Sequence, residues 1–122
     1  MKKILIIDDD EFFRKFYTGK LEEAGYAVVL ASNGEEGLKK IKDEQPDLVL
    51  LDIIMPKMDG FEVLHAIAEK KVINSAPILI FSTLDQAKDL DEAKQLGAVD
   101  AIKKDLADWN STLAKISSYM PH

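Results

Sequence analysis

The chain contains no cysteine, and this absence excludes disulfide bonds, thiolate zinc sites and cysteine nucleophiles. It also has no apolar run near the roughly 18 residues that a membrane-spanning helix requires. Basic residues are outnumbered: 16 lysines and arginines stand against 22 aspartates and glutamates, for a net charge of −6. This acidic balance argues against direct binding to nucleic acid or to a membrane surface.

The start of the chain does not predict a secretory signal. Two lysines precede an apolar run, but that run covers only residues 4–7 and ends in three aspartates. A signal peptide needs a core of about 7–15 apolar residues. We therefore expect a cytoplasmic protein.

Composition and length predict one globular domain. Of the 122 residues, 47% are hydrophobic, which is enough for a proper core and argues against disorder. No linker, repeat or low-complexity tract divides the sequence. We expect a single domain over residues 1–122, with no separate output domain.

Short apolar segments alternate with amphipathic ones along the whole chain. The apolar segments predict five strands, at residues 4–7, 26–31, 48–51, 77–81 and 99–103. The segments with helical spacing predict five helices, at residues 11–24, 35–44, 61–71, 84–96 and 106–118. This alternation is typical of an α/β fold, a doubly wound parallel sheet with right-handed crossovers and helices on both faces.

Polar side chains follow four of the predicted strands, at the point where each strand ends. They are Asp8 and Asp9 after the first strand, Asp52 after the third, Ser82 after the fourth and Lys104 after the fifth. The carboxyl ends of parallel strands share one edge of the sheet, where such folds bind ligands. We therefore expect three carboxylates, one hydroxyl and one ammonium to converge there.

Simpler explanations exist for single acids in this set. Asp10 and Glu11 fit the first turn of a helix, where acids are favoured. Asp8 and Asp9 fit that explanation less well, because they precede the helix. Asp52 alone could be an acid that merely touches water at a strand end. The joint placement of five groups at one edge is what favours a functional site.

The chemistry of these groups indicates a magnesium site for phosphoryl transfer. Carboxylates at this density require a cation, and oxygen ligands suit Mg²⁺. A carboxylate beside Mg²⁺ can act as a nucleophile towards phosphorus. Lys104 would then neutralise charge on the transferring phosphoryl oxygens, and Ser82 could donate a hydrogen bond to one of them.

On these motifs the sequence resembles the receiver domain of bacterial two-component response regulators over essentially its whole length. The motifs are the Asp8-Asp9 pair, the Asp-Ile-Ile-Met-Pro-Lys-Met-Asp-Gly run at residues 52–60, Ser82, and Lys104 after a Gly-Ala pair. The resemblance implies a flavodoxin-like sheet with strand order 2-1-3-4-5.

The resemblance also implies a role for each site residue. Asp52 would accept a phosphoryl group from a phosphohistidine of a histidine kinase or a histidine phosphotransfer protein. Asp9, Asp52 and the backbone carbonyl of Ile54 would bind Mg²⁺, and Asp8 would assist through water. Ser82 and Lys104 would contact the phosphoryl group and couple it to the face made by the fourth helix and the last strand and helix. The signal would then pass to an unknown downstream protein or onward along a relay.

Two positions depart from the family pattern. The switch residue on the last strand is usually aromatic but is Ala101 here, and the residue after the site lysine is usually proline but is Asp105 here. Ala101 has no rotamer to switch, so we expect the signal to pass through residues 83–85 and the helix after them. A cis bond before a residue other than proline costs about 2.5–4 kcal/mol, so we expect a trans peptide between Lys104 and Asp105.

Three other functions share part of this pattern. A haloacid-dehalogenase-type phosphatase also uses a strand-end aspartate and Mg²⁺, but it needs a threonine where Phe12 stands. A flavodoxin needs a phosphate loop rich in Ser, Thr and Gly, whereas the acidic loop here would repel the flavin phosphate. A degenerate receiver would bind proteins without being phosphorylated; the complete set of five site residues argues against it.

Overall fold

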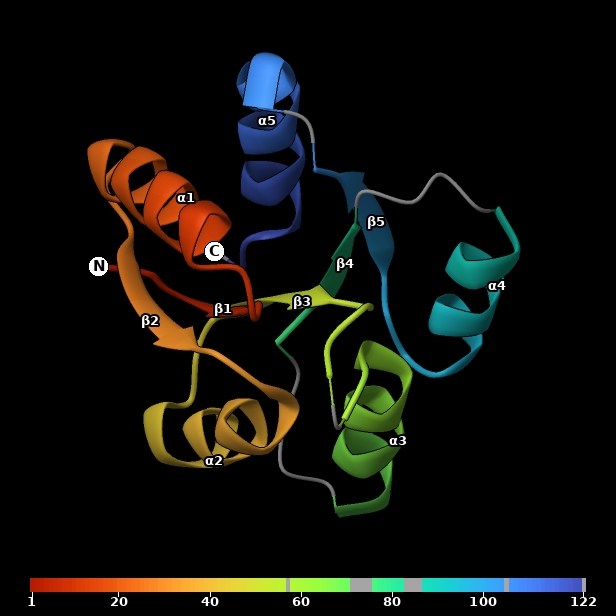
Figure 1. Cartoon of the computed structure of the whole chain (residues 1–122). Coiled ribbons are helices and arrows are strands. Elements are labelled where there is room, and N and C mark those ends of the chain that lie inside the picture. Colours follow the sequence, from red (N-terminus) through yellow and green to blue (C-terminus); the bar gives the residue numbers. More distant parts are fainter. Residues whose placement is uncertain (57, 71–75, 83–86, 105, 122) are drawn as a thin grey trace.

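A computed structural model describes residues 1–56, 58–70, 76–82, 87–104 and 106–121. The five strands are β1 (Lys3–Ile7), β2 (Ala27–Ala31), β3 (Leu48–Asp52), β4 (Ile78–Ser82) and β5 (Asp100–Lys103). They form one parallel sheet in the order β2-β1-β3-β4-β5 (Figure 1). The predicted strand order 2-1-3-4-5 is therefore confirmed.

Helices cover both faces of this sheet. They are α1 (Glu11–Glu23), α2 (Gly34–Glu44), α3 (Gly60–Lys70), α4 (Ala87–Gln95) and α5 (Trp109–Tyr119), with a short 3₁₀ turn, η1 (Leu106–Asp108), before α5. Helices α1 and α5 lie on one face, and α2, α3 and α4 lie on the other (Figure 1).

Alternating side chains of the central strands build two separate cores. On β1, Ile4 and Ile6 face α1 and α5, whereas Leu5 and Ile7 face the other layer. All five residues of β3 are buried, as expected for a strand covered on both sides. The near-continuous apolar sequence of these strands therefore follows from their position between two helical layers.

The predicted helices differ from the observed ones at several ends and faces. Helical spacing predicts Ala24 as an inward residue of the first helix and a buried stripe of Phe61, Leu64, Ile67 and Ala68 on the third. In the structure Ala24 lies beyond α1 and is exposed, and Ala68 on α3 is exposed. Val63, which that stripe omits, is buried on α3 together with Leu64 and Ile67. The predicted helix at 106–118 is divided into η1 and α5. The predicted ends at residues 71 and 84–86 lie outside the described residues.

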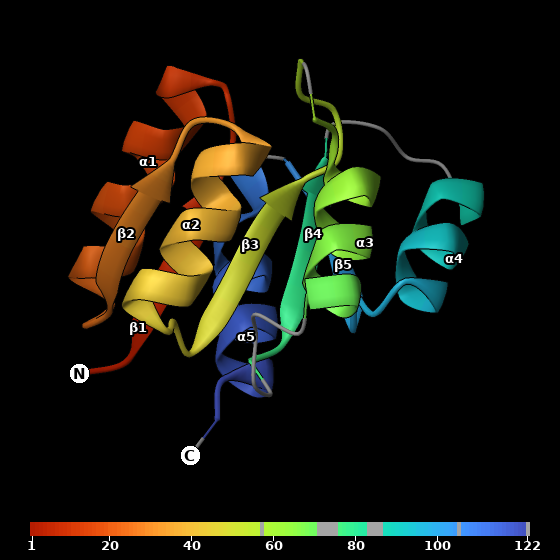
Figure 2. The same cartoon turned by 90° about the horizontal axis from the view of Figure 1, so that it is seen from below.

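Local signals explain where α1 begins and ends. The Asp10 side chain caps α1, because its Oδ1 accepts hydrogen bonds from the N–H groups of Phe12 and Phe13 at 2.9 and 3.3 Å. Gly25 follows α1 with a φ of 97°, a conformation that favours glycine. The tips of the strands, where β1 leads into α1, lie at the end of the sheet opposite to the N-terminus (Figure 2).

Candidate functional site

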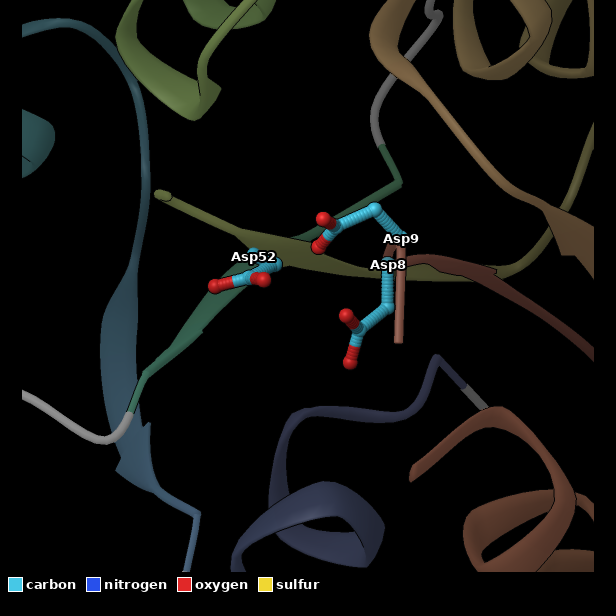
Figure 3. Close-up of side chains that lie close together, drawn as sticks. All are labelled: Asp8, Asp9 and Asp52. Atoms are coloured by element: carbon cyan, nitrogen blue, oxygen red, sulfur yellow. The ribbon is translucent and has the colours of Figure 1, made fainter. Parts of the chain in front are cut away.

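Three carboxylates meet at the tips of β1 and β3 (Figure 3). Asp8 and Asp9 directly follow β1, and Asp52 is the last residue of β3. These strands are neighbours, with Ile7 paired to Leu51, so the register brings Asp8 beside Asp52. One oxygen from each of the three aspartates lies within 4.8 Å of the other two.

The three aspartates differ in their contact with solvent. Asp8 is 0% exposed and Asp52 is 4% exposed, whereas Asp9 is exposed. Asp8 Oδ1 accepts a hydrogen bond from the Asp10 N–H at 3.0 Å, and Asp52 Oδ1 accepts one from the Ile54 N–H at 3.3 Å. The two buried carboxylates are therefore held in fixed directions by the backbone.

Lys104 is the cation among these acids. Its Nζ lies 2.7 Å from Asp8 Oδ2 and donates a hydrogen bond to Asp52 Oδ2 at 3.2 Å. The Lys104 side chain is only 5% exposed. The tip of β5 thus supplies an ammonium that joins the two buried carboxylates.

Burial raises the pKa of Asp52 to about 7 in the protein without a bound cation. The Lys104 charge and hydrogen bond lower this pKa, and the neighbouring charge of Asp8 raises it. Burial dominates because the carboxylate loses the solvation of water when it is enclosed. A bound cation would favour the charged form of Asp52 and so reverse the shift.

The donor set fits a magnesium ion. Besides the three close carboxylates, Asp8 Oδ2 is fully buried and accepts no hydrogen bond, although it has the ion pair with Lys104. A hard cation prefers such carboxylate oxygens and keeps several waters, which the exposed side of Asp9 allows. Asp8, Asp9 and Asp52 could therefore hold Mg²⁺ together.

The loop after β3 leaves no space for a side chain at Gly60. A Cβ there would lie 2.6 Å from the backbone oxygen of Asp52 and 2.7 Å from Cα of Ile53. The Gly60 N–H also donates to the Ile53 carbonyl at 2.8 Å. Gly60 therefore packs the start of α3 directly against the backbone of Asp52 and Ile53 at the end of β3.

Ser82 is the last residue of β4, which lies between β3 and β5, and its backbone is paired with that of Lys103. Its side chain lies outside the described residues, as do the residues 83–86 of the expected signal path and Asp105 of the expected trans peptide. The Ile54 side chain is 54% exposed, and the predicted role of its carbonyl stays a prediction.

Two contacts of this edge were missed by sequence reasoning. Arg14 donates a hydrogen bond to the Asp8 carbonyl at 2.7 Å. Phe13, for which helical spacing predicts only a role in the core, lies against the Lys104 ammonium together with Phe81. Helical spacing placed Phe13 and Arg14 in the first turns of α1, but nothing in the sequence shows that this end of α1 reaches the tips of β1 and β5.

Comparison with known proteins shows which family the chain resembles. Residues 4–115 match the response regulator receiver domain. The chain belongs to this family. The receiver domain resembles the transcriptional regulatory protein PhoP of Bacillus subtilis, with 42% identity over 103 residues, which cover 84% of this chain and 42% of PhoP. It resembles PilH of Pseudomonas aeruginosa with 36% identity, covering 85% of this chain and 86% of PilH.

A solved structure supports the same family. The beryllofluoride-activated receiver domain of RstA from Klebsiella pneumoniae superposes with a TM-score of 0.89 at 26% identity, covering 99% of this chain and 100% of that one. The chain spans less than half the length of several curated relatives, among them PhoP and two methylesterases. None of the helices in the described part of the chain is long and apolar enough to cross a membrane.

Proposed function

We propose that this receiver domain accepts a phosphoryl group on Asp52. The observation that supports this most is the position of Asp52 between two other carboxylates and one buried ammonium. Asp52 is the only one of the three acids that contacts Lys104 and also lies at the centre of the sheet, on β3. Its hydrogen bond to Lys104 places a positive charge where phosphoryl oxygens would arrive.

The transfer forms one bond and breaks one bond. An Asp52 carboxylate oxygen attacks phosphorus, and the bond from phosphorus to a histidine nitrogen of the donor breaks. The electron pair stays on that nitrogen, the other ring nitrogen of the donor carries a proton so that a neutral imidazole leaves, and Asp52 becomes an acyl phosphate. The attacking oxygen must be charged, which requires the proton of a neutral Asp52 to leave before the transfer.

The remaining site residues assist this transfer. Asp8, Asp9, Asp52 and the backbone carbonyl of Ile54 would hold Mg²⁺, which when bound neutralises charge on the phosphoryl oxygens. Lys104 would stabilise the same oxygens from the other side of the site. Ser82, at the neighbouring tip of β4, would donate its hydroxyl to one of them.

The partners follow from the same chemistry. The donor is a histidine kinase or a histidine phosphotransfer protein, and the recipient of the signal is a further protein or the next member of a relay. PhoP is a transcriptional regulatory protein and other relatives are methylesterases, so the relatives themselves differ in output. We therefore assign the phosphoacceptor step to this domain and no enzymatic activity on a separate substrate.

Acetyl phosphate tests the proposal directly. With Mg²⁺ present, we expect one phosphoryl group per chain by intact mass, mapped to Asp52 after reductive trapping. Without Mg²⁺, phosphorylation should be far slower. Steady phosphate release that depends on Asp8 and leaves no adduct on Asp52 would instead support a phosphatase. Purified kinases and phosphotransfer proteins, tested as a panel, would identify the natural donor.

A further inference from the structure

Two aromatic rings lie against the ammonium of Lys104. Its Nζ is 4.6 Å from the ring centroid of Phe13 on α1 and 4.9 Å from that of Phe81 on β4. A cation over the face of an aromatic ring is attracted by the electrons of that ring, and the attraction grows when water is excluded. The Lys104 side chain is only 5% exposed, so water is largely excluded from the ammonium and the attraction to the rings is strengthened.

The two rings are held in place by a third. Tyr17, which is 1% exposed, stacks on Phe13 with centroids 6.2 Å apart and meets Phe81 edge-on at 5.2 Å. Phe81 itself is 1% exposed. The ring faces that meet Lys104 are therefore oriented by the core between α1 and the sheet.

An aromatic face has an advantage over another acid at this edge. Asp8, Asp9 and Asp52 already repel one another, and a phosphoryl group would add more negative charge. A further carboxylate on α1 would increase this repulsion and would bind Lys104 tightly. A neutral ring attracts the ammonium without adding net charge, which leaves Lys104 able to contact a phosphoryl group.

We propose that Phe13 is a positioning residue of the phosphorylation site. Its neutral ring face holds the Lys104 ammonium within reach of Asp52. This inference rests on the phosphoacceptor function proposed above. Phe81 shares the contact, but it is part of the central sheet, so Phe13 on the helix is the position at which the contact can be tested.

The chain offers a matched control one residue away. Phe12 is on the same helix turn, is 57% exposed, and meets Phe13 edge-on at 5.7 Å. Replacing either residue by leucine removes one ring from the start of α1. Only Phe13→Leu removes a ring that lies against Lys104.

The first experiment compares phosphorylation rates with acetyl phosphate at saturating Mg²⁺. From the usual strength of a desolvated cation–π contact, we expect Phe13→Leu to lower the rate by on the order of tenfold. Phe12→Leu should stay within about twofold of the wild type, since an exposed ring edge contributes little. Phe13→Trp, which keeps an aromatic face, should retain more of the rate than Phe13→Leu.

A second experiment separates the ring's electrons from its shape. Phenylalanines with one, two and three ring fluorines are placed at position 13 only, and the rate is measured for each. Fluorine weakens the negative face of the ring while changing its size little, so we expect the rate to fall stepwise. A flat series, together with equal rates for Phe13→Leu and Phe12→Leu, would overturn the inference.

A nuclear magnetic resonance measurement tests the contact between Phe13 and Lys104 independently of phosphorylation. The Lys104 ε-methylene protons should be shifted upfield by the ring faces, and Phe13→Leu should reduce that shift while Phe12→Leu should not. If the wild type forms no adduct on Asp52, the phosphoacceptor function fails, and this shift still decides whether Phe13 holds Lys104. An unchanged shift in Phe13→Leu would refute the contact itself.

Discussion

The acids of two lysine–aspartate pairs in this domain have pKa values that are shifted in opposite directions. Lys104 and Asp52 are nearly buried, with 5% and 6% of their side chains exposed. Lys115 and Asp100, on α5 and β5, are 41% and 24% exposed and lie 3.7 Å apart. The pKa of Asp52 is raised to about 7 by burial, even though Lys104 is 3.2 Å away.

Asp100 shows what happens when the acid keeps contact with water. Burial again pushes its pKa upward, but hydrogen bonds from the Ala101 N–H at 2.7 Å and the Tyr119 hydroxyl at 2.8 Å oppose it. With the charge of Lys115, they hold the pKa of Asp100 below its usual value. The number of hydrogen bonds and the access of water, rather than the presence of a lysine, decide the direction of the shift.

This difference separates a site from a structural contact. The charge of the Asp100 carboxylate is compensated by two hydrogen bonds and by Lys115, so no further cation is needed there. Without a bound cation, the groups around Asp52 do not fully compensate its buried charge, so the binding of Mg²⁺ or of a proton is favoured.

Replacing Asp52 by asparagine should abolish phosphorylation by acetyl phosphate, because the nucleophile is removed while the size is kept. At pH 8 the same change should raise the midpoint of thermal unfolding without Mg²⁺, since one buried charge is lost. Asp100→Asn is the matched control: it should lower that midpoint and leave phosphorylation unchanged. Phosphorylation of Asp52→Asn at the wild-type rate, on another residue, would refute the role of Asp52.

Replacing Gly60 by alanine should displace the loop that carries Asp52, without changing any charge. The added Cβ would lie 2.6 Å from the Asp52 backbone oxygen, so the backbone must shift. Overpacking of this kind typically costs about 1–3 kcal/mol of unfolding free energy. Gly19→Ala is the control, because no atom lies within 4 Å of a Cβ there; it should raise stability by up to about 1 kcal/mol. Urea denaturation measures both variants, and equal stability would contradict the close packing.

Mg²⁺ should stabilise the domain, because a ligand that binds only the folded state raises its unfolding free energy. At a concentration 100 times the dissociation constant, the gain is about 2.7 kcal/mol. Asp9→Asn should remove most of this gain. Asp10→Asn should retain it, because Asp10 caps α1. Thermal melts with and without Mg²⁺ measure both, and an equal loss in the two variants would refute the assignment of Asp9 as a ligand.

The pH dependence of stability should differ between the two acids. Because the folded-state pKa of Asp52 is raised from 3.8 to about 7, the folded protein holds the proton more tightly than the unfolded chain. Its contribution is fully present below about pH 4 and is lost as the pH rises through 7. Mg²⁺ should therefore stabilise more at pH 8 than at pH 5. Asp52→Asn should lack the decline between pH 4 and 7.

Asp100 should act in the opposite direction. Its folded-state pKa is lowered, so its contribution is present above the ordinary value of 3.8 and is lost as the pH falls through the lower folded-state pKa. Tyr119→Phe removes one of its hydrogen bonds and should move the folded-state pKa of Asp100 back toward 3.8, so that less stability is lost in acid. The effect on stability at pH 7 should be the smallest of this set, and phosphorylation should be unchanged. Nuclear magnetic resonance titration of Asp100 in both proteins provides the measurement.

The succession of strands and helices along the chain, and the edge of the sheet at which the candidate site lies, could be predicted from the amino-acid sequence. Apolar runs bounded by turn residues predict buried strands, and helical spacing predicts the amphipathic segments between them. Asp8, Asp9, Asp52 and Lys104 could be predicted as neighbours because parallel strands end at one edge. These features depend on local pattern and on chain direction, which a sequence contains.

The differences in burial among those groups could not be predicted from the sequence, because they depend on how the layers pack. That Asp8 and Asp52 are buried while Asp9 is exposed depends on the packing of α1 and the loop before Gly60. Ala68 on α3 was predicted to be buried but is exposed, because the face that packs on the sheet is formed by Gly60, Val63, Leu64 and Ile67. The contact of Phe13 with Lys104 joins residues 91 positions apart, and such a distance in the chain is bridged only when the sheet and helix layers pack.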